Sequence, residues 1–251
     1  MTEPRFLPDE HFRMAAGKAI GVSSITLGLY AILILPAVGL AEVLIQDFIL
    51  HSALPAIGFG IFALIAVPRQ PFNNSVWVAV WAGLISGISV AGYATMFPVV
   101  VSSGVESNAD AIGAVTPAEL PPVAAVLYSF VGLALLAIIL ILCVGLLLFP
   151  DGQLPSPRWR WVAWGSMATS LIFAGAIAHE FRPSSNTPLG SGSGQWTGGG
   201  RFVDDIAMIA VGFSLVSLIS LGLRYRGSVG LARQQYRWMG LGCGMFIVVL
   251  L

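Results

Sequence analysis

The chain has 251 residues, 57% of them hydrophobic and only 10% charged, with a mean hydropathy of +0.87. Soluble domains carry about 25% charged residues, so this composition excludes a water-soluble globular protein. Twelve Lys and Arg residues balance twelve Asp and Glu residues and form no basic stripe, which gives no support to nucleic-acid binding.

Six apolar stretches contain no Asp, Glu, Lys or Arg, and a seventh is cut short by the end of the sequence. A helix needs roughly 20 apolar residues to cross a bilayer core about 30 Å thick, and its backbone must satisfy its own hydrogen bonds there. We therefore expect an all-α fold, a polytopic transmembrane helix bundle of six complete spans and a truncated seventh. The predicted spans are 19–40, 48–67, 76–101, 123–149, 161–178, 206–223 and 238–251. Residues 1–18 would form a cytoplasmic tail, and residues 19–251 a single membrane domain.

Basic residues accumulate in alternate connecting segments. Short cytoplasmic loops are enriched in Lys and Arg, so these segments and the N-terminus are predicted to face the cytoplasm. Only Arg182 and Arg201 lie on the opposite side. The ten basic residues on the predicted cytoplasmic side are Arg5, Arg13, Lys18, Arg69, Arg158, Arg160, Arg224, Arg226, Arg233 and Arg237.

Residue types that carry catalysis are sparse. The three histidines, His11, His51 and His179, show no spacing that would place two imidazoles on one helix face. Cys143 and Cys243 are isolated within predicted spans and lack the neighbours that activate a thiol. We expect no catalytic, cofactor-binding or metal-binding residue in this chain.

Three small residues, Gly83, Gly87 and Ala91, share one face of the third predicted span. Small residues four positions apart let helices approach closely in a membrane. The face is expected to pack inside the bundle, with a homodimer seam as the alternative.

Three serines, Ser214, Ser217 and Ser220, recur every third residue in the sixth predicted span. Interhelical hydrogen bonds are their expected role. The alternative is a polar pathway, as in a small transporter or permease-like protein. Against a pathway, no ionisable residue lies near the midplane of any predicted span.

Two of the predicted cytoplasmic loops carry specific motifs. The first combines a Pro-Asp-Gly turn with a proline-stiffened segment and an Arg-Trp-Arg anchor suited to anionic headgroups. Its residues are Phe149, Pro150, Asp151, Gly152, Leu154, Pro155, Arg158, Trp159 and Arg160. The second motif comprises Arg224, Tyr225, Arg226, Arg233, Gln234, Gln235 and Trp238.

These motifs resemble loops in the N-terminal membrane region of actinobacterial sensor histidine kinases and related membrane proteins. The family usually has Arg at the position of Gln153, and its second loop commonly differs from this chain at Ala232, Tyr236 and Arg237. The resemblance implies a multi-pass protein of the bacterial inner membrane, with a cytoplasmic N-terminus, that acts as a sensor or anchor module.

In full-length members of that family a cytoplasmic kinase region follows and phosphorylates a response regulator. These 251 residues contain no such region, and His11 does not match a phosphoacceptor helix. The expected partners are the lipid bilayer, a second copy in a homodimer and, only through a kinase region, a response regulator. Two alternatives stay open, namely basic loops that merely fix orientation and a stand-alone membrane scaffold.

Overall fold

The computed structural model describes residues 10–40, 49–104, 121–130, 133, 136–137, 140–180, 200–230, 232–237 and 239. Within these residues the regular elements are all helical, which confirms the predicted all-α class. Three helical stretches are long and apolar enough to cross a membrane, namely α1 (Glu10–Ala37), α4 (Asn74–Ser102) and Met208–Gly227 of α10 (Gly200–Gly227). The other elements are α3 (Ile49–Ala66), α6 (Pro122–Ser129), the π-helix η2 (Leu140–Gly145), α8 (Leu146–Leu148), the 3-10 helix η3 (Pro157–Trp159) and α9 (Arg160–Glu180).

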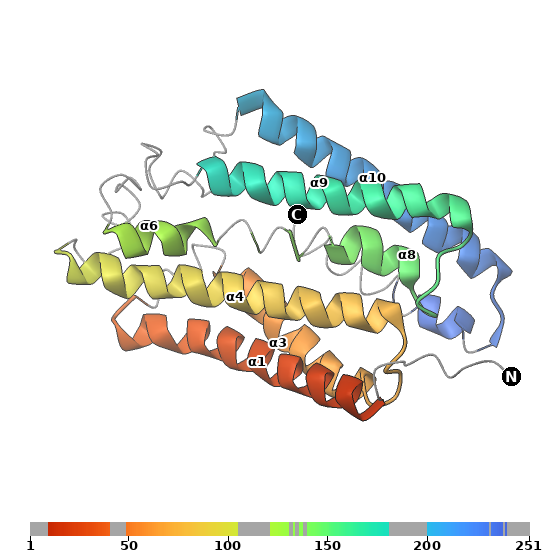
Figure 1. Cartoon of the computed structure of the whole chain (residues 1–251), viewed down its shortest axis with the longest axis horizontal. Helices are drawn as coiled ribbons and strands as arrows, with labels where there is room; N and C mark the ends of the chain where they lie inside the picture. Colours follow the sequence, from red (N-terminus) through yellow and green to blue (C-terminus); the bar gives the residue numbers. More distant parts are fainter. Residues whose placement is uncertain are drawn as a thin grey trace, which may run out of the picture.

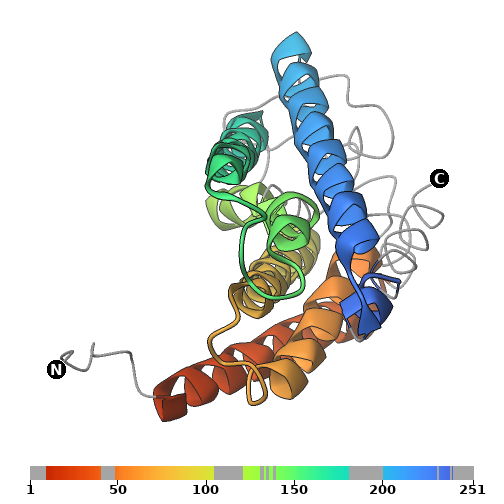
Figure 2. The ribbon, with the colours of Figure 1, turned by 90° about the vertical axis from the view of Figure 1, so that its right-hand side faces the viewer.

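The helices form two groups with a connecting column between them (Figures 1 and 2). Helices α1, α3 and α4 pack against one another, and α9 packs against α10. The column of α6, η2 and α8 lies between the groups and contacts both of them. Helix α4 is central, because half of the residues in its apolar stretch are buried, against 22% in α10.

The first group is packed through glycines. Helix α1 buries a row of residues spaced three or four apart, and a Cβ added at Gly21 would lie 2.9 Å from the carbonyl oxygen of Gly60 on α3. The reverse contact, from a Cβ at Gly60 to the Gly21 oxygen, would be 2.7 Å. The two backbones therefore touch, which is the packing that small residues permit between membrane helices. The buried row of α1 is Gly17, Gly21, Ser24, Gly28, Ala31 and Leu35.

The small face predicted on the third span lies inside this group. A Cβ on Gly83 would come within 2.8 Å of Phe59 on α3, and one on Gly87 within 3.2 Å of Leu27 on α1. Ala91 is buried as well. The expected packing of this face within the bundle is confirmed.

Helix α1 begins at Glu10, nine positions before the predicted start of the first span. Its first helical turns carry charge and pack against the segment that connects α3 to α4. The Arg13 guanidinium lies 4.9 Å from the Phe72 ring centroid, and Gly17 packs against Val67. The apolar run marks only the part of a helix that is free of charge, so a charged extension was not predicted. Helix α10 likewise extends beyond the predicted 206–223 at both ends. The predicted tail residues 1–9 and most of the predicted span 238–251 lie outside the described residues.

The predicted span 123–149 is not one uniform α-helix. Helix α6 ends at Ser129, Phe130 forms a turn, and residues Leu140–Gly145 adopt π-helical geometry. The Phe130 carbonyl accepts a 2.6 Å hydrogen bond from the Ser89 hydroxyl of α4, while the missing side chain of Gly92 leaves room for the Phe130 ring. A neighbouring helix thus satisfies the backbone where regular helix geometry is lost, as an apolar environment requires.

Candidate functional site

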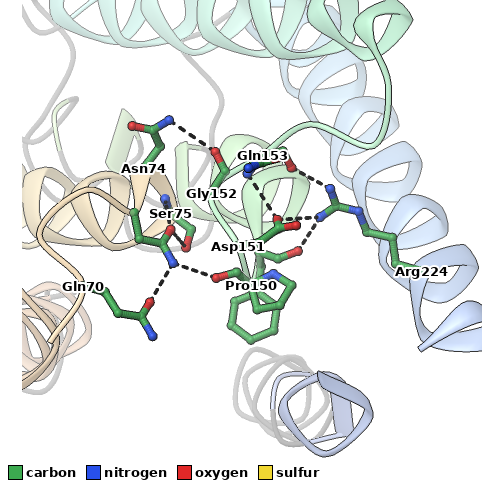
Figure 3. A network of polar contacts seen from close by, with 10 residues as sticks. Gln70, Asn74, Ser75, Pro150, Asp151, Gly152, Gln153 and Arg224 are labelled. Carbon is green, nitrogen blue, oxygen red and sulfur yellow. Dashed lines mark hydrogen bonds and ion pairs between the residues drawn. The ribbon is translucent and has the colours of Figure 1, made fainter. Parts of the chain in front are cut away.

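Three connecting segments meet at one end of the bundle, shown in Figure 3. They are the turn between α3 and α4 with the first two residues of α4 (67–75), the loop after α8 (149–153), and the end of α10 with the described residues that follow it (224–230, 232–237 and 239). We call this meeting point the loop junction. The first predicted motif supplies its centre and the second supplies one of its walls, although the two are separated by about 70 residues of sequence.

The centre of the loop junction is a tight turn over residues 149–152. The Gly152 amide donates to the Leu148 carbonyl at 2.7 Å, and the Asp151 carboxylate accepts from the Gln153 amide at 3.2 Å. Gly152 has a positive φ of 74°, and a Cβ there would lie 2.6 Å from the side-chain oxygen of Asn73. Backbone conformation and space both require glycine at this position. The predicted Pro-Asp-Gly turn is confirmed.

Asn73 joins this turn to the start of α4. Its side-chain oxygen caps the helix by accepting from the Ser75 amide at 2.9 Å, and its side-chain nitrogen donates to the Pro150 carbonyl at 2.8 Å. The same nitrogen donates to Gln70 Oε1 at 2.7 Å, while the side-chain nitrogen of Asn74 donates to the Gly152 carbonyl at 3.2 Å. One residue thus sets the first turn of α4 and the position of the neighbouring loop.

The sequence analysis did not select these polar residues of the α3–α4 turn. The signal was nevertheless present, because an Asn-Asn-Ser run directly before an apolar stretch is a typical helix N-terminus. The contact of this run with a loop more than 70 residues away could not be predicted from the spacing of residues in the sequence.

Arg224, at the end of α10, holds the turn from the opposite side (Figure 3). Its Nη1 donates to the Phe149 carbonyl and its Nη2 to the Gln153 carbonyl, each at 2.5 Å. Asp151 Oδ1 lies 3.9 Å from Nη1. The Arg224 side chain is 15% exposed whereas Asp151 is 58% exposed, so the charge-assisted bonds to carbonyls outweigh the long, solvated ion pair. Arg224 thereby bridges both sides of the turn.

Residues after α10 fold back onto this turn. Tyr236 is buried and its ring meets the Phe149 ring edge to face, with centroids 5.8 Å apart. Burial raises the pKa of the Tyr236 phenol. The Tyr225 ring lies under the Arg233 guanidinium at 5.3 Å, and its hydroxyl accepts from Arg237 Nε at 3.3 Å. These contacts order the segment that leads away from α10.

The structure brings together only part of the two predicted motifs. The residues in contact are Phe149, Pro150, Asp151, Gly152, Arg224, Tyr225 and Arg233. The side chains of Arg158, Arg160, Arg226 and Gln234 are exposed and form no hydrogen bond or ion pair with another described residue. Leu154, Pro155 and Trp159 lie in the same loop as the turn, outside its hydrogen-bond network, and Trp238 lies outside the described part of the chain.

The serine row of α10 faces the connecting column. Ser214 donates to the Ala210 carbonyl at 2.9 Å, and its hydroxyl lies 3.3 Å from the Cys143 thiol of η2. Ser217 and Ser220 are buried, and within the described residues their hydroxyls have no hydrogen-bond partner. The contact with Cys143 is of the interhelical kind predicted for this row.

No protein-family model matches the chain, and no curated protein or solved structure is significantly similar to it. The loop junction is therefore the feature of the molecule from which a function has to be inferred.

Proposed function

We propose that the chain is the membrane-embedded sensor or anchor module of a signal-transducing protein of the two-component histidine kinase type. The observation that carries the proposal is the contact between the two motif loops through Arg224. Loops that only fixed orientation would need positive charge on one side of the membrane and no contact with each other. A bridge between them couples the position of α10 to that of the turn after α8.

The proposed topology is that of the sequence analysis, with six complete spans, a seventh beginning near residue 238 and the N-terminus in the cytoplasm. The start of α1, the α3–α4 turn, the loop after α8 and the end of α10 all lie at the right-hand end of the molecule in Figure 1. Arg13, Arg69 and Arg224 come from three of these segments, so basic residues gather at one end, as the cytoplasmic end of a membrane protein would require.

In this proposal a stimulus shifts α10 against the central column. Because Arg224 holds the carbonyls of Phe149 and Gln153, such a shift either moves the turn with α10 or breaks the bridge. The helical residues 232–237 lie a few positions beyond the end of α10 and would carry the change onward. A small number of directional contacts between packed elements is suited to two discrete arrangements.

The test uses the full-length gene product in membranes, with autophosphorylation from ATP as the readout. Arg224→Gln should change the stimulus-free rate of phosphorylation, whereas Arg226→Gln should leave it unaltered, because the Arg226 side chain has no partner among the described residues. Equal rates in both variants, or no phosphorylation of the unaltered protein, would count against the proposal. Accessibility tags at positions 153 and 230 test the topology separately, and exterior labelling would refute it.

A further inference from the structure

A large hollow lies between α3, α4 and the column of residues 137–150. Its volume is about 820 Å³, within the range of about 300–1,000 Å³ typical of small-molecule sites. Lining residues run from Pro55 to Arg69 along α3 and its following turn, and from Ser75 to Ser86 along α4. Gln235 and Met239 border the hollow at the loop junction.

The hollow is elongated, because its lining residues follow three neighbouring elements lengthwise. At a rise of about 1.5 Å per residue, the lining stretch Pro55 to Ala66 on α3 and the stretch Ser75 to Ser86 on α4 each cover about 16 Å. One leaflet of a bilayer core is about 15 Å deep, half of its full thickness. A single acyl chain of leaflet length therefore matches the long dimension of the hollow.

Most of its wall is apolar. It includes Phe59, Phe62 and Ile65 of α3 and, from the column, Ile141 and Leu146. Phe62 and Ile65 remain 42% and 53% exposed. A Cβ built on Gly58, which also lines the hollow, would meet no atom within 4 Å. The wall therefore has open space beside large apolar side chains, which an acyl chain would fill without displacing them.

One end of the hollow is polar. Arg69 donates through Nη1 to the Ile65 carbonyl at 2.7 Å, which leaves most of its five N–H groups unused, and it forms no ion pair within the described residues. Gln70 and Gln235 also line the hollow, and each carries a side-chain amide. A guanidinium with neighbouring amides is suited to a phosphate oxygen cluster and offers nothing to a cation.

We propose that the hollow binds one acyl chain of an anionic glycerophospholipid, with the phosphate of its headgroup held by Arg69, Gln70 and Gln235. The proposal goes beyond the signalling function and does not require it. It does give the loop junction a ligand, because Phe149 and Pro150 line the same hollow and also belong to the turn that Arg224 holds. A bound lipid would thus touch the loop that contacts α10.

The experiment places the purified full chain in phosphatidylcholine nanodiscs that contain a small fraction of phosphatidylglycerol with a photoactivatable group on one acyl chain. Irradiation followed by peptide mass spectrometry should place the label on residues 58–66 and 141–146. Arg69→Gln should reduce this labelling about tenfold, the change expected for loss of one charge-assisted contact. Arg158→Gln is the matched control, because Arg158 is also exposed and does not line the hollow.

A second pair of variants tests the space itself. Gly58→Phe projects a ring into the hollow and should abolish the labelling there, whereas Gly222→Phe should not alter it. A Cβ at either glycine would meet no atom within 4 Å, so both variants are expected to fold, and a melting curve of each checks this.

Two results would overturn the proposal. Equal labelling by the phosphatidylcholine analogue would show that the polar end does not select an anion. A photoreactive amino acid placed at Phe62 that links to this chain itself, or to a second copy, in place of lipid would show that protein fills the hollow. Neither result bears on the phosphorylation test with Arg224, so the two proposals fail separately.

Discussion

The two helix groups are held together by different means. In the α1–α3–α4 group, glycines bring backbones into contact, as at Gly21 and Gly60. On the other side α10 is largely uncovered, and its contacts include the Phe213 ring against Gly165, the Ser214–Cys143 pair and the Arg224 bridge. Apolar surfaces gain little by leaving lipid, so close packing and hydrogen bonds hold membrane helices together. In the proposed function, the first group would accordingly be the fixed part of the molecule and α10 the element that a stimulus moves.

The largest expected effect comes from separating the backbones of the first group. In Gly60→Ala the new Cβ would lie 2.7 Å from the Gly21 carbonyl oxygen and 3.1 Å from the Ile25 amide nitrogen. Both are backbone atoms, so α1 and α3 must move apart, and the free energy of unfolding should fall by about 2–3 kcal/mol. Thermal unfolding in detergent micelles measures the loss.

Gly58→Ala is the matched control for this substitution, on the same helix and with no atom within 4 Å of the new Cβ. It should leave stability unchanged or raise it by up to about 1 kcal/mol, because alanine favours the helix. If the two variants unfold at the same temperature, the first group is not held by backbone contact and the contrast with α10 is lost.

The next effect tests the attachment of α10. Arg224→Gln removes two charge-assisted hydrogen bonds to carbonyls, at least one of them partly buried, and should lower the free energy of unfolding by about 2 kcal/mol. Hydrogen exchange of the amides of residues 149–153 should speed up more than exchange in α1. Arg226→Gln is the neighbouring control. Unchanged exchange in the turn would mean that other contacts fix α10.

Local features of the sequence predicted the helical class and the turn at residues 149–152. An apolar run without charge favours a membrane helix, and a Pro-Asp-Gly sequence favours a tight turn, through interactions among residues that are close in sequence. Neither prediction required knowledge of contacts with distant parts of the chain. Gly17, Gly21 and Gly28 also have the spacing of a helix-packing face, but such a face was predicted only for Gly83 and Gly87.

Other features could not be read from the chain alone. The irregular backbone at Phe130 depends on Ser89 and Gly92 of a different helix. The site at the loop junction depends on Asn73 and Arg224, which approach the same turn from opposite sides. Each motif was visible, but their contact arises from the packing of helices between them.

A smaller effect separates the cap of α4 from its link to the loop. Asn73→Ser keeps a side-chain oxygen that caps the helix and removes the nitrogen that donates to the Pro150 carbonyl. We expect a loss of about 1 kcal/mol, typical of one neutral hydrogen bond, because the second bond of this nitrogen, to Gln70 Oε1, is exposed and its loss adds little. Asn74→Ser should cost less, because its bond to the Gly152 carbonyl is longer, at 3.2 Å. The reverse order, measured by thermal unfolding, would show that Asn73 acts mainly as a cap.

The smallest effect concerns the Arg224–Asp151 ion pair of the loop junction. Asp151→Asn removes a charge 3.9 Å from Arg224 and keeps the side-chain oxygen that accepts from the Gln153 amide. Because the Asp151 side chain is 58% exposed, stability should change by less than about 0.5 kcal/mol and should not become more sensitive to salt. Unfolding measured at low and high ionic strength decides the point. A loss as large as that of Arg224→Gln would mean that charge attraction, and not hydrogen bonding to carbonyls, attaches α10 to the turn, and salt would then be expected to release it.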